Sequence, residues 1–294
     1  MGAEGFAATA LLTVSLVLLG WFAGTYGTII GAGGGFIMVP ALLIVFSLSS
    51  QQASALSLTV MVAAAISGNV AYARQRRIDY RAALPLAIAS LPGAWLGAVV
   101  SSFLAGRVFS IAFALLLASI SAYLLINPER RARGGDETSD DDSPELPTAP
   151  PSLWQRLGWG RVRRQLVTSE GQSYSFEYDG RIGFLASPCI GFISGVFGIG
   201  GGLIFVPILV QLLRFPVHVA TATSFFILMI TAAGGAFSHA LLGHVPWDFA
   251  IPMAIGLIAG GQTGAYISKR LRGTWIVRGG AVGLGIVALR LLLR

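Results

Sequence analysis

Residues 31–40 read GAGGGFIMVP and residues 198–207 read GIGGGLIFVP, so seven of ten positions are identical at an offset of 167 residues. The same offset aligns later landmarks without a gap, for example Pro85 with Pro252. Two halves with the same ordered landmarks indicate a duplication. They predict two structural repeats that meet at a shared interface.

The composition is that of a membrane protein. Hydrophobic residues make up 54% of the 294 residues and charged residues only 11%, whereas a soluble domain is about 25% charged. We therefore exclude a soluble globular enzyme, a disordered chain and a nucleic-acid-binding protein, although the net charge is +7. The single cysteine, Cys189, excludes a disulfide framework and a cysteine-rich metal site, and we expect neither a metal nor another cofactor.

Ten apolar runs fill the chain, five on each side of a polar connector. A membrane span needs about 20 apolar residues, and two of the runs are too short to span comfortably. Each short run directly follows a glycine cluster. The fold class that we predict is an all-α polytopic membrane protein with two inverted repeats of about five hydrophobic segments and Gly-broken helices at the midplane. The runs are 6–30, 36–48 (short), 52–73, 82–104, 107–126, 182–198, 203–213 (short), 219–242, 248–268 and 274–293.

The charges between the runs predict that one repeat is inverted relative to the other. In the first half, the gap after the third run carries three arginines and the next gap carries one; in the second half the equivalent gaps carry none and three basic residues. Positive loops stay in the cytoplasm, so equivalent loops lie on opposite sides of the membrane. The residues are Arg74, Arg76, Arg77 and Arg107 in the first half, and Lys269, Arg270 and Arg272 in the second.

The domain boundaries follow from this pattern. We expect a first transmembrane repeat in residues 1–126, a cytoplasmic linker in 127–180 and a second transmembrane repeat in 181–294. The first part of the linker, GGDETSDDDSPELPTAPP at 134–151, is acidic and rich in proline, which predicts disorder. The second part, SLWQRLGWGRVRRQL at 152–166, alternates apolar residues with arginines. It suits either a short amphipathic helix on the lipid surface or an ordinary basic loop.

The paired glycine motifs, the duplicated halves and the long connector resemble the sulfite exporter TauE/SafE family of bacterial membrane transporters. The resemblance covers roughly 10–126 and 182–293 and leaves the connector unmatched. It implies transport of small sulfur-containing anions, such as sulfite or an organosulfonate like sulfoacetate. It also implies a multi-pass protein of the bacterial inner membrane.

The glycine motifs suit anion binding by the backbone. A triple glycine breaks a helix and lets the main chain approach a ligand closely. The helix that begins after each break exposes N–H groups at the positive end of its macrodipole, and such an end binds anions without a basic side chain. The alternative is that these glycines only allow close helix packing. The candidate glycines are Gly33, Gly34 and Gly35 in the first half, and Gly200, Gly201 and Gly202 in the second.

Neutral polar residues complete the candidate site, because no carboxylate falls inside a predicted span except Asp248 at the very edge of the run 248–268. Cation pathways usually place carboxylates at depth, so their absence favours an anion. The alternative for the hydroxyl residues is a hydrogen bond to the preceding helical turn. His239 is either a proton carrier or a hydrogen-bonded structural histidine. The polar candidates, all predicted to be buried, are Ser54, Ser57, Asn69, Thr221, Ser224 and Gln262.

The function that we predict is secondary transport of a small sulfur-containing anion by alternating access. An anion channel of the same architecture is the alternative, and a non-transporting assembly subunit is a further one. An enzyme is not expected, since the chain contains no HExxH or GxSxG motif and no acidic pair at depth. The expected partners are the anion and the lipid bilayer, with no nucleic acid, and the pattern leaves a homo-oligomer open.

Overall fold

The computed structural model describes most of the chain outside the linker. The described residues are 3–104, 106–126, 161–169, 171–268, 270–271 and 273–292. The acidic segment for which we predict disorder, and the apolar residues 152–160 of the next segment, lie outside this range.

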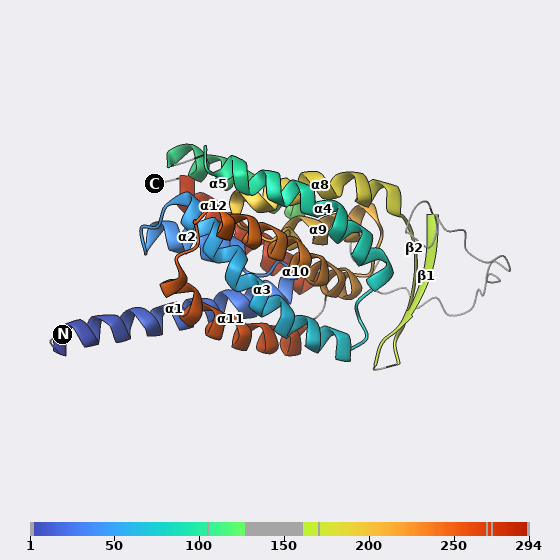
Figure 1. Ribbon diagram of the computed structural model, residues 1–294. Helices are drawn as coiled ribbons and strands as arrows, with labels where there is room; N and C mark the ends of the chain where they lie inside the picture. The colour runs from blue at the N-terminus through green and yellow to red at the C-terminus, as the bar shows by residue number, and fades with distance from the viewer. Residues whose placement is uncertain are drawn as a thin grey trace.

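Five helices form the first half of the molecule (Figure 1). They are α1 (Ala3–Ile30), α2 (Gly35–Ile44), α3 (Ser50–Arg74), α4 (Tyr80–Ser101) and α5 (Arg107–Ile126). Local sequence explains two of the helix starts. Ser49 and Gln52 form a capping box at α3, and the Asp79 carboxylate accepts hydrogen bonds from the first amides of α4.

A β-hairpin and a second set of helices follow. The strands are β1 (Arg161–Val167) and β2 (Ser173–Asp179). The helices are α8 (Gly180–Phe197), α9 (Gly202–Pro207) with its π-helical continuation η1 (Ile208–Leu212), α10 (Val217–Leu241), α11 (Trp247–Ser268) and α12 (Gly273–Leu292). The helix boundaries match the ten predicted apolar runs closely.

The lengths of the helices confirm an all-α polytopic membrane protein. Six described helices are long and apolar enough to cross a membrane: α1, α3, α4, α8, α10 and α11. The segments Gly35–Ile44 and Gly202–Leu212 are apolar but too short, as the two short runs predict. About 20 residues are needed to cross the hydrocarbon core.

The long helices pack as two interleaved groups, each drawn from both halves of the chain. Helix α1 lies along α11, and α8 lies along α4; α3 contacts both α10 and α11, α10 contacts both α3 and α4, and α12 lies beside α5. Glycines allow the closest of these approaches, because a Cβ atom at Gly24 or Gly256 would collide with the backbone of the facing helix. Small residues at membrane helix interfaces commonly serve this purpose.

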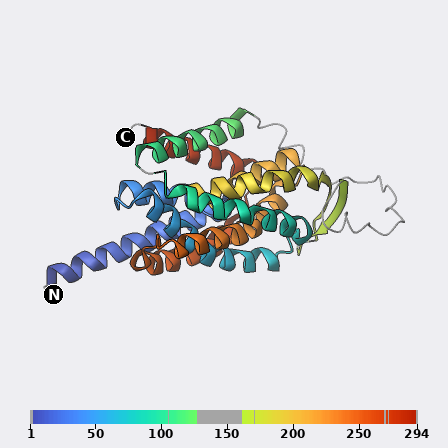
Figure 2. The same ribbon diagram turned by 45° about the horizontal axis from the view of Figure 1, so that its top comes forward.

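The contacts along each helix pair fix the helix directions. On α3 and α10, Gly68 faces Phe225 while Leu58 faces Gly235, so these two helices run antiparallel. The order of the contacting residues along the other packed helix pairs shows that α1, α3 and α11 run in one direction and α4, α8 and α10 in the opposite direction. The hairpin therefore lies at one end of the bundle, and α1 begins and α12 ends at the other (Figures 1 and 2). We call these the hairpin end and the terminal end.

The hairpin corrects our interpretation of the end of the linker. Residues Arg161–Val167 form a strand paired antiparallel with Ser173–Asp179, rather than an amphipathic helix or an irregular loop. Phe176 and Tyr178 of β2 are buried against Phe215 of the bundle, with ring centroids 4.4 and 5.1 Å from that ring. Burial of these aromatic faces favours the strand pairing in this segment, because alternate residues of a strand share one face.

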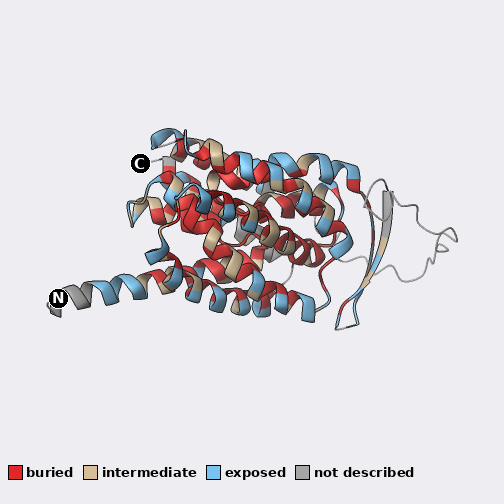
Figure 3. Cartoon of the chain, viewed as in Figure 1, coloured by how far each residue is buried: buried red, intermediate tan, exposed pale blue. Residues whose placement is uncertain are grey.

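Buried residues fill the centre of the bundle, whereas the outer faces of the helices and the first turns of α1 that can be described are exposed (Figure 3). A hydrophobic cluster runs through α1, α2, α3 and α10. The two glycine turns lie inside this cluster, so the core holds in place the segment that the sequence marks as functional.

Candidate functional site

The two glycine turns have the same backbone conformation. Three glycines of the first turn have φ angles of +82°, +75° and +85°, and three of the second have +71°, +71° and +77°. Residues other than glycine rarely adopt these angles. The last glycine of each set directly precedes the first residue of a short helix. In order, the residues are Gly31, Gly33 and Gly34, then Gly198, Gly200 and Gly201.

The turns pack directly against one another. A Cβ atom at Gly35, the first residue of α2, would lie 2.7 Å from the carbonyl oxygen of Gly198. A Cβ atom at Gly202, the first residue of α9, would lie 2.5 Å from the carbonyl oxygen of Gly31. Each short helix therefore begins beside the opposite turn, and only glycine fits at these two positions. The starts of α2 and α9 therefore lie together in the core.

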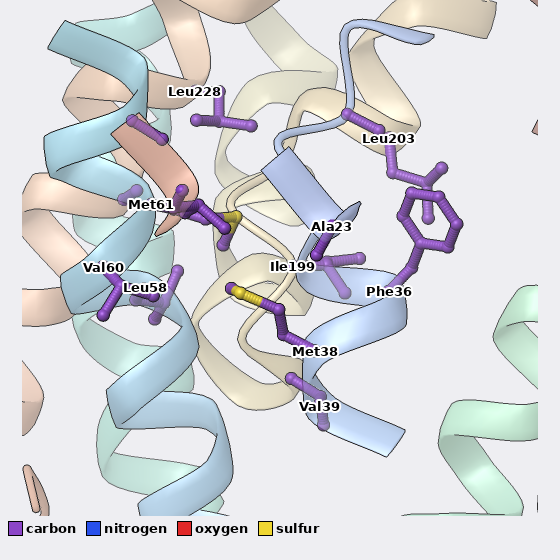
Figure 4. Packing of buried hydrophobic residues seen from close by; sticks show 14 of the residues in the cluster. Ala23, Phe36, Met38, Val39, Leu58, Val60, Met61, Ile199, Leu203 and Leu228 are labelled. Atoms are coloured by element: carbon purple, nitrogen blue, oxygen red, sulfur yellow. The ribbon is translucent and has the colours of Figure 1, made fainter. Parts of the chain in front are cut away.

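Two apolar side chains cover the turns. Met61 of α3 and Leu228 of α10 occupy equivalent positions at the 167-residue offset, and both are fully buried. A Cβ atom at Gly200 would lie 3.0 Å from Cε of Met61 and 3.1 Å from Cγ of Leu228. Figure 4 shows Met61 beside the segment that carries Ile199. In this conformation the space next to the turns is filled by hydrocarbon rather than open to water.

The predicted hydroxyl groups hold the turns in place. Ser57 donates to the carbonyl oxygen of Gly198 at 2.7 Å, and Ser224 donates to that of Gly31 at 3.1 Å. These are equivalent bonds, one in each half, and both serines are fully buried. Ser54 donates to Val196 at 3.1 Å. Ser224 Oγ also lies 2.9 Å from the carbonyl oxygen of Thr221 in its own helix. Thr221 is the exception, because its hydroxyl donates to the carbonyl oxygen of Val217 in the same helix.

The two predicted amides lie in different surroundings. Asn69 is buried; its Nδ2 donates to the carbonyl of Phe225 at 3.3 Å, and among the described residues its Oδ1 has no hydrogen-bond partner. Gln262 is exposed, so our expectation of burial is wrong. It lies on the outer side of the α3–α11 contact, where Nε2 donates to the carbonyl of Ser67 at 2.7 Å. A hydropathy pattern does not say which side of a helix faces outward.

His239 is fully buried and bonded through both ring nitrogens. Nε2 contacts the carbonyl oxygen of Gly195 at 3.1 Å, and Nδ1 contacts Nδ1 of His244 at 3.1 Å. The equivalent residue in the first half is Tyr72, whose hydroxyl donates to the carbonyl of Thr28 at 2.8 Å. Thr28 and Gly195 are themselves equivalent. The 167-residue offset could have revealed Tyr72, which sequence reasoning missed.

A polar cluster around Asp79 at the hairpin end also escaped sequence reasoning. Oδ1 of Asp79 accepts from the amides of Arg81 and Ala82 at 3.1 and 3.2 Å. Its Oδ2 lies 3.8 Å from Nε of Arg164 in β1. Burial raises the pKa of the neighbouring Tyr178 hydroxyl, and the negative charge of Asp79 raises it further. These groups attach the hairpin to the start of α4.

Metal ligation is not favoured by the geometry. Among the residues that could be searched, no group of three or more His, Cys, Asp or Glu side chains is placed to hold a metal ion. The arrangement instead offers two helix starts with the amide groups that the first turn of any helix leaves without intrahelical partners. Such an arrangement binds an anion through the backbone.

Comparison with known proteins agrees with this picture. A family model described as Sulfite exporter TauE/SafE matches residues 16–291. The chain is 32% identical to "Probable membrane transporter protein YunE" of Bacillus subtilis, over 90% of this chain and 91% of that protein. It is 24% identical to "Probable membrane transporter protein MJ0441" of Methanocaldococcus jannaschii, over 89% and 88%. No solved structure matches the chain.

Proposed function

Because the chain belongs to the sulfite exporter TauE/SafE family of membrane transporters, we propose that it is a secondary transporter of a small sulfur-containing anion, sulfite or an organosulfonate. The observation that carries the proposal is the meeting of the two helix starts at Gly35 and Gly202 in the core. Two positive helix ends at one point stabilise a negative charge there.

The charge distribution supports an anion rather than a cation as the substrate. Within the six described candidate spans, with α1 counted from Thr9 and therefore without Glu4, the carboxylates are limited to Asp248 in the first turn of α11, and it is exposed. A cation would have to be coordinated at depth by neutral groups alone. An oxyanion is matched by backbone amides and hydroxyl groups, which are what the glycine turns and their serines offer.

We place the hairpin end in the cytoplasm. Basic residues gather there at the ends of the long helices and in the loops, whereas Arg107 and Arg290 are the described basic residues near the terminal end. Cytoplasmic loops carry an excess of basic residues. At the helix ends and in the loops of the hairpin end, the described basic residues are Arg74, Arg76, Arg77, Arg81, Arg181, Arg214 and Arg270, and β1 adds Arg161, Arg163 and Arg164. This orientation would place the linker in the cytoplasm, and the inner membrane of a bacterium is the location that we propose with it.

Transport requires Met61 and Leu228 to leave the turns. We propose two moving groups that mix the halves, α1 and α3 with α11, and α8 and α10 with α4, because the most extensive helix contacts, α1 with α11 and α4 with α8, lie within them. Within each group the contacts are extensive, and Gly24 or Gly97 allow close backbone approach. Sliding of α3 against α10 would separate Met61 from Leu228 and open the turns to one end at a time.

Counterflow in proteoliposomes tests the proposal. Vesicles preloaded with sulfite, thiosulfate, sulfoacetate or taurine are diluted into the labelled compound, and we expect saturable exchange for at least one sulfur-containing anion and none for a cation of similar size. Ohmic currents without counterflow would reject the carrier and favour the anion channel. Absence of both would leave the assembly-subunit alternative.

A further inference from the structure

The His239–His244 pair joins an exposed part of the terminal end to the end of α8. His244 lies in the loop between α10 and α11 and is half-buried, whereas His239 is fully buried in the last turn of α10. Gly195, which His239 contacts, lies three residues before the second glycine turn. The two imidazoles therefore form a hydrogen-bonded path from the surface into the core.

The partners fix the tautomers of both rings in the neutral state. A carbonyl oxygen can only accept, so Nε2 of His239 carries a proton and donates it to Gly195. The Nδ1 atom of neutral His239 is then an acceptor, and the facing Nδ1 of His244 must carry the proton between them. This leaves Nε2 of His244 as the basic nitrogen on the partly exposed ring.

The equivalent pair in the first half cannot do the same. Tyr72 and Arg77 occupy the positions of His239 and His244, and the Arg77 guanidinium lies 5.7 Å from the centre of the Tyr72 ring. A phenol with a pKa near 10 and a guanidinium that stays charged do not exchange protons at neutral pH. The contact to the helix carbonyl is the same in both halves, so histidine is not needed for that contact.

We infer that the His239–His244 pair is a proton-relay site that serves the proposed anion transport. Nε2 of His244 takes a proton from water, and the proton on its Nδ1 passes to Nδ1 of His239. His244 is then neutral and His239 is an imidazolium that still donates to Gly195. A buried cation is costly unless a negative charge accompanies it. Proton and anion therefore occupy the core together. When the turns open to the hairpin end, the anion leaves and the Nδ1 proton of His239 passes to the water that enters, so that both move in the same direction.

The parts of α3, α4 and α8 that face the histidine pair carry no charge. The facing parts of α3, α4 and α8, namely 50–61, 94–101 and 190–197, contain no charged side chain, and Cys189 is the nearest titratable group before the last of them. On the loop side the nearest carboxylate in sequence is Asp248, which is exposed. No described acid is placed to neutralise a His239 imidazolium, so that role falls to the substrate.

Nuclear magnetic resonance of the ¹⁵N-histidine-labelled protein tests the site without any substrate. The chain has three histidines, and His218→Gln removes the one outside the pair. We expect a proton on Nε2 of His239 and on Nδ1 of His244, with scalar coupling between the two Nδ1 atoms. A proton on Nε2 of neutral His244, or rings without coupling, would overturn the relay.

Transport in proteoliposomes tests the coupling. With sulfoacetate as the probe and the membrane potential clamped at zero by potassium and valinomycin, an outside-acid gradient of one pH unit should drive up to about tenfold accumulation for one proton per anion. The double variant His239→Tyr/His244→Arg copies the pair already present in the first half; it should retain counterflow at equal pH but lose this accumulation. His244→Gln should behave in the same way, and His218→Gln should match the wild type.

The outcomes separate the two proposals. Accumulation in the double variant equal to that of the wild type would refute the relay while leaving transport intact. Counterflow in the wild type that ignores the pH gradient would refute it as well. If no sulfur-containing anion exchanges, the proposed function fails, and the histidine resonances still decide whether the relay exists.

Discussion

At the scale of single residues, two glycines decide how closely the two glycine turns can pack. Gly35 and Gly202 have no Cβ atom, which leaves room for the carbonyl oxygen of the opposite turn. The starts of α2 and α9 can therefore pack in direct contact. Each carbonyl is in turn fixed by one serine from the third helix of the opposite half. Glycine and serine together therefore set the geometry, and neither acts through a charge.

Substitution of Gly35 or Gly202 by alanine should destabilise the protein. The added carbon overlaps a backbone oxygen that cannot rotate away, and overpacking of this kind costs about 1–3 kcal/mol. Thermal unfolding in detergent measures the loss, and anion counterflow should fall with it. Gly279→Ala is the control, because that glycine is also helical and the new carbon would meet nothing closer than the hydroxyl oxygen of Tyr26 at 3.7 Å. An equal loss in the control would show that the contact between the turns is not what matters.

Ser57→Ala and Ser224→Ala should have similar effects, since they remove equivalent hydrogen bonds. Each leaves a buried carbonyl oxygen without its donor, which costs about 1–3 kcal/mol. The free energy of unfolding measures both changes. Ser101→Ala provides the control, because that buried hydroxyl donates within its own helix. If Ser101→Ala costs as much as the other two, the serines have no special role at the turns.

Stability should also depend on His244. Burial lowers the pKa of His244 in the folded protein below its usual value near 6.5. The unfolded chain then binds more protons than the folded one as the pH falls through this range, so the melting temperature should decrease from pH 8 to pH 5. His244→Gln should reduce that decrease. A profile unchanged by the substitution would assign the pH dependence to other groups.

At the scale of elements, the hairpin is the part that the apolar runs do not explain. It covers the hairpin end of the bundle through Phe176 and Tyr178 on Phe215, and through Arg164 beside Asp79. The amide of Ser169 at its turn donates to the carbonyl of Gln75, just after α3. The hairpin thus contacts both halves of the bundle at one end.

Phe176→Ala should release the hairpin while leaving the bundle folded. Loss of a buried phenylalanine side chain costs about 3–5 kcal/mol, which is more than two short strands recover on their own. Hydrogen exchange should become faster for the amides of β1 and β2 and stay unchanged in α3 and α10. Glu177→Ala, on the exposed face of the same strand, should leave the exchange unaltered. Slow exchange in the Phe176 variant would mean that other contacts hold the hairpin.

At the scale of the whole molecule, each moving group that we propose contains helices from both halves. Thr25 of α1 lies 2.8 Å from Thr263 of α11, measured between their hydroxyl oxygens, inside one group. Leu58 of α3 faces Gly235 of α10, between the groups. A covalent link within a group should therefore leave transport intact, whereas a covalent link between the groups should stop it.

A short bis-thiol reagent distinguishes these links in a Cys189→Ser background. Cross-linked Thr25→Cys/Thr263→Cys should retain counterflow, because α1 and α11 move together. Cross-linked Leu58→Cys/Gly235→Cys should lose counterflow until the link is cleaved. The uncross-linked form of each variant is its own control. Retained counterflow in the second pair would reject the proposed division of the helices.

The sequence repeat, the ten helices of the described residues and the position of the glycine turns follow from the sequence alone. Membrane spans need long apolar runs and helix breaks need glycine, so both leave a direct mark on the order of residues. The serines at 57 and 224 were also identified, because the 167-residue offset pairs them. The offset carries the same information for Tyr72 and His239, whose shared contact became visible only in the structure.

Tertiary structure alone decided what each polar group contacts. Gln262 and Asn69 look alike in the sequence, yet one is exposed at a helix contact and the other is buried, since the rotation of a helix depends on the helices packed against it. The hairpin escaped prediction because its strands gain their burial from Phe215, which is distant in sequence. The sequence determined a duplicated membrane protein with two broken helices. Packing between distant segments determined that the two breaks meet, what covers them, and that one half holds a histidine pair where the other has tyrosine and arginine.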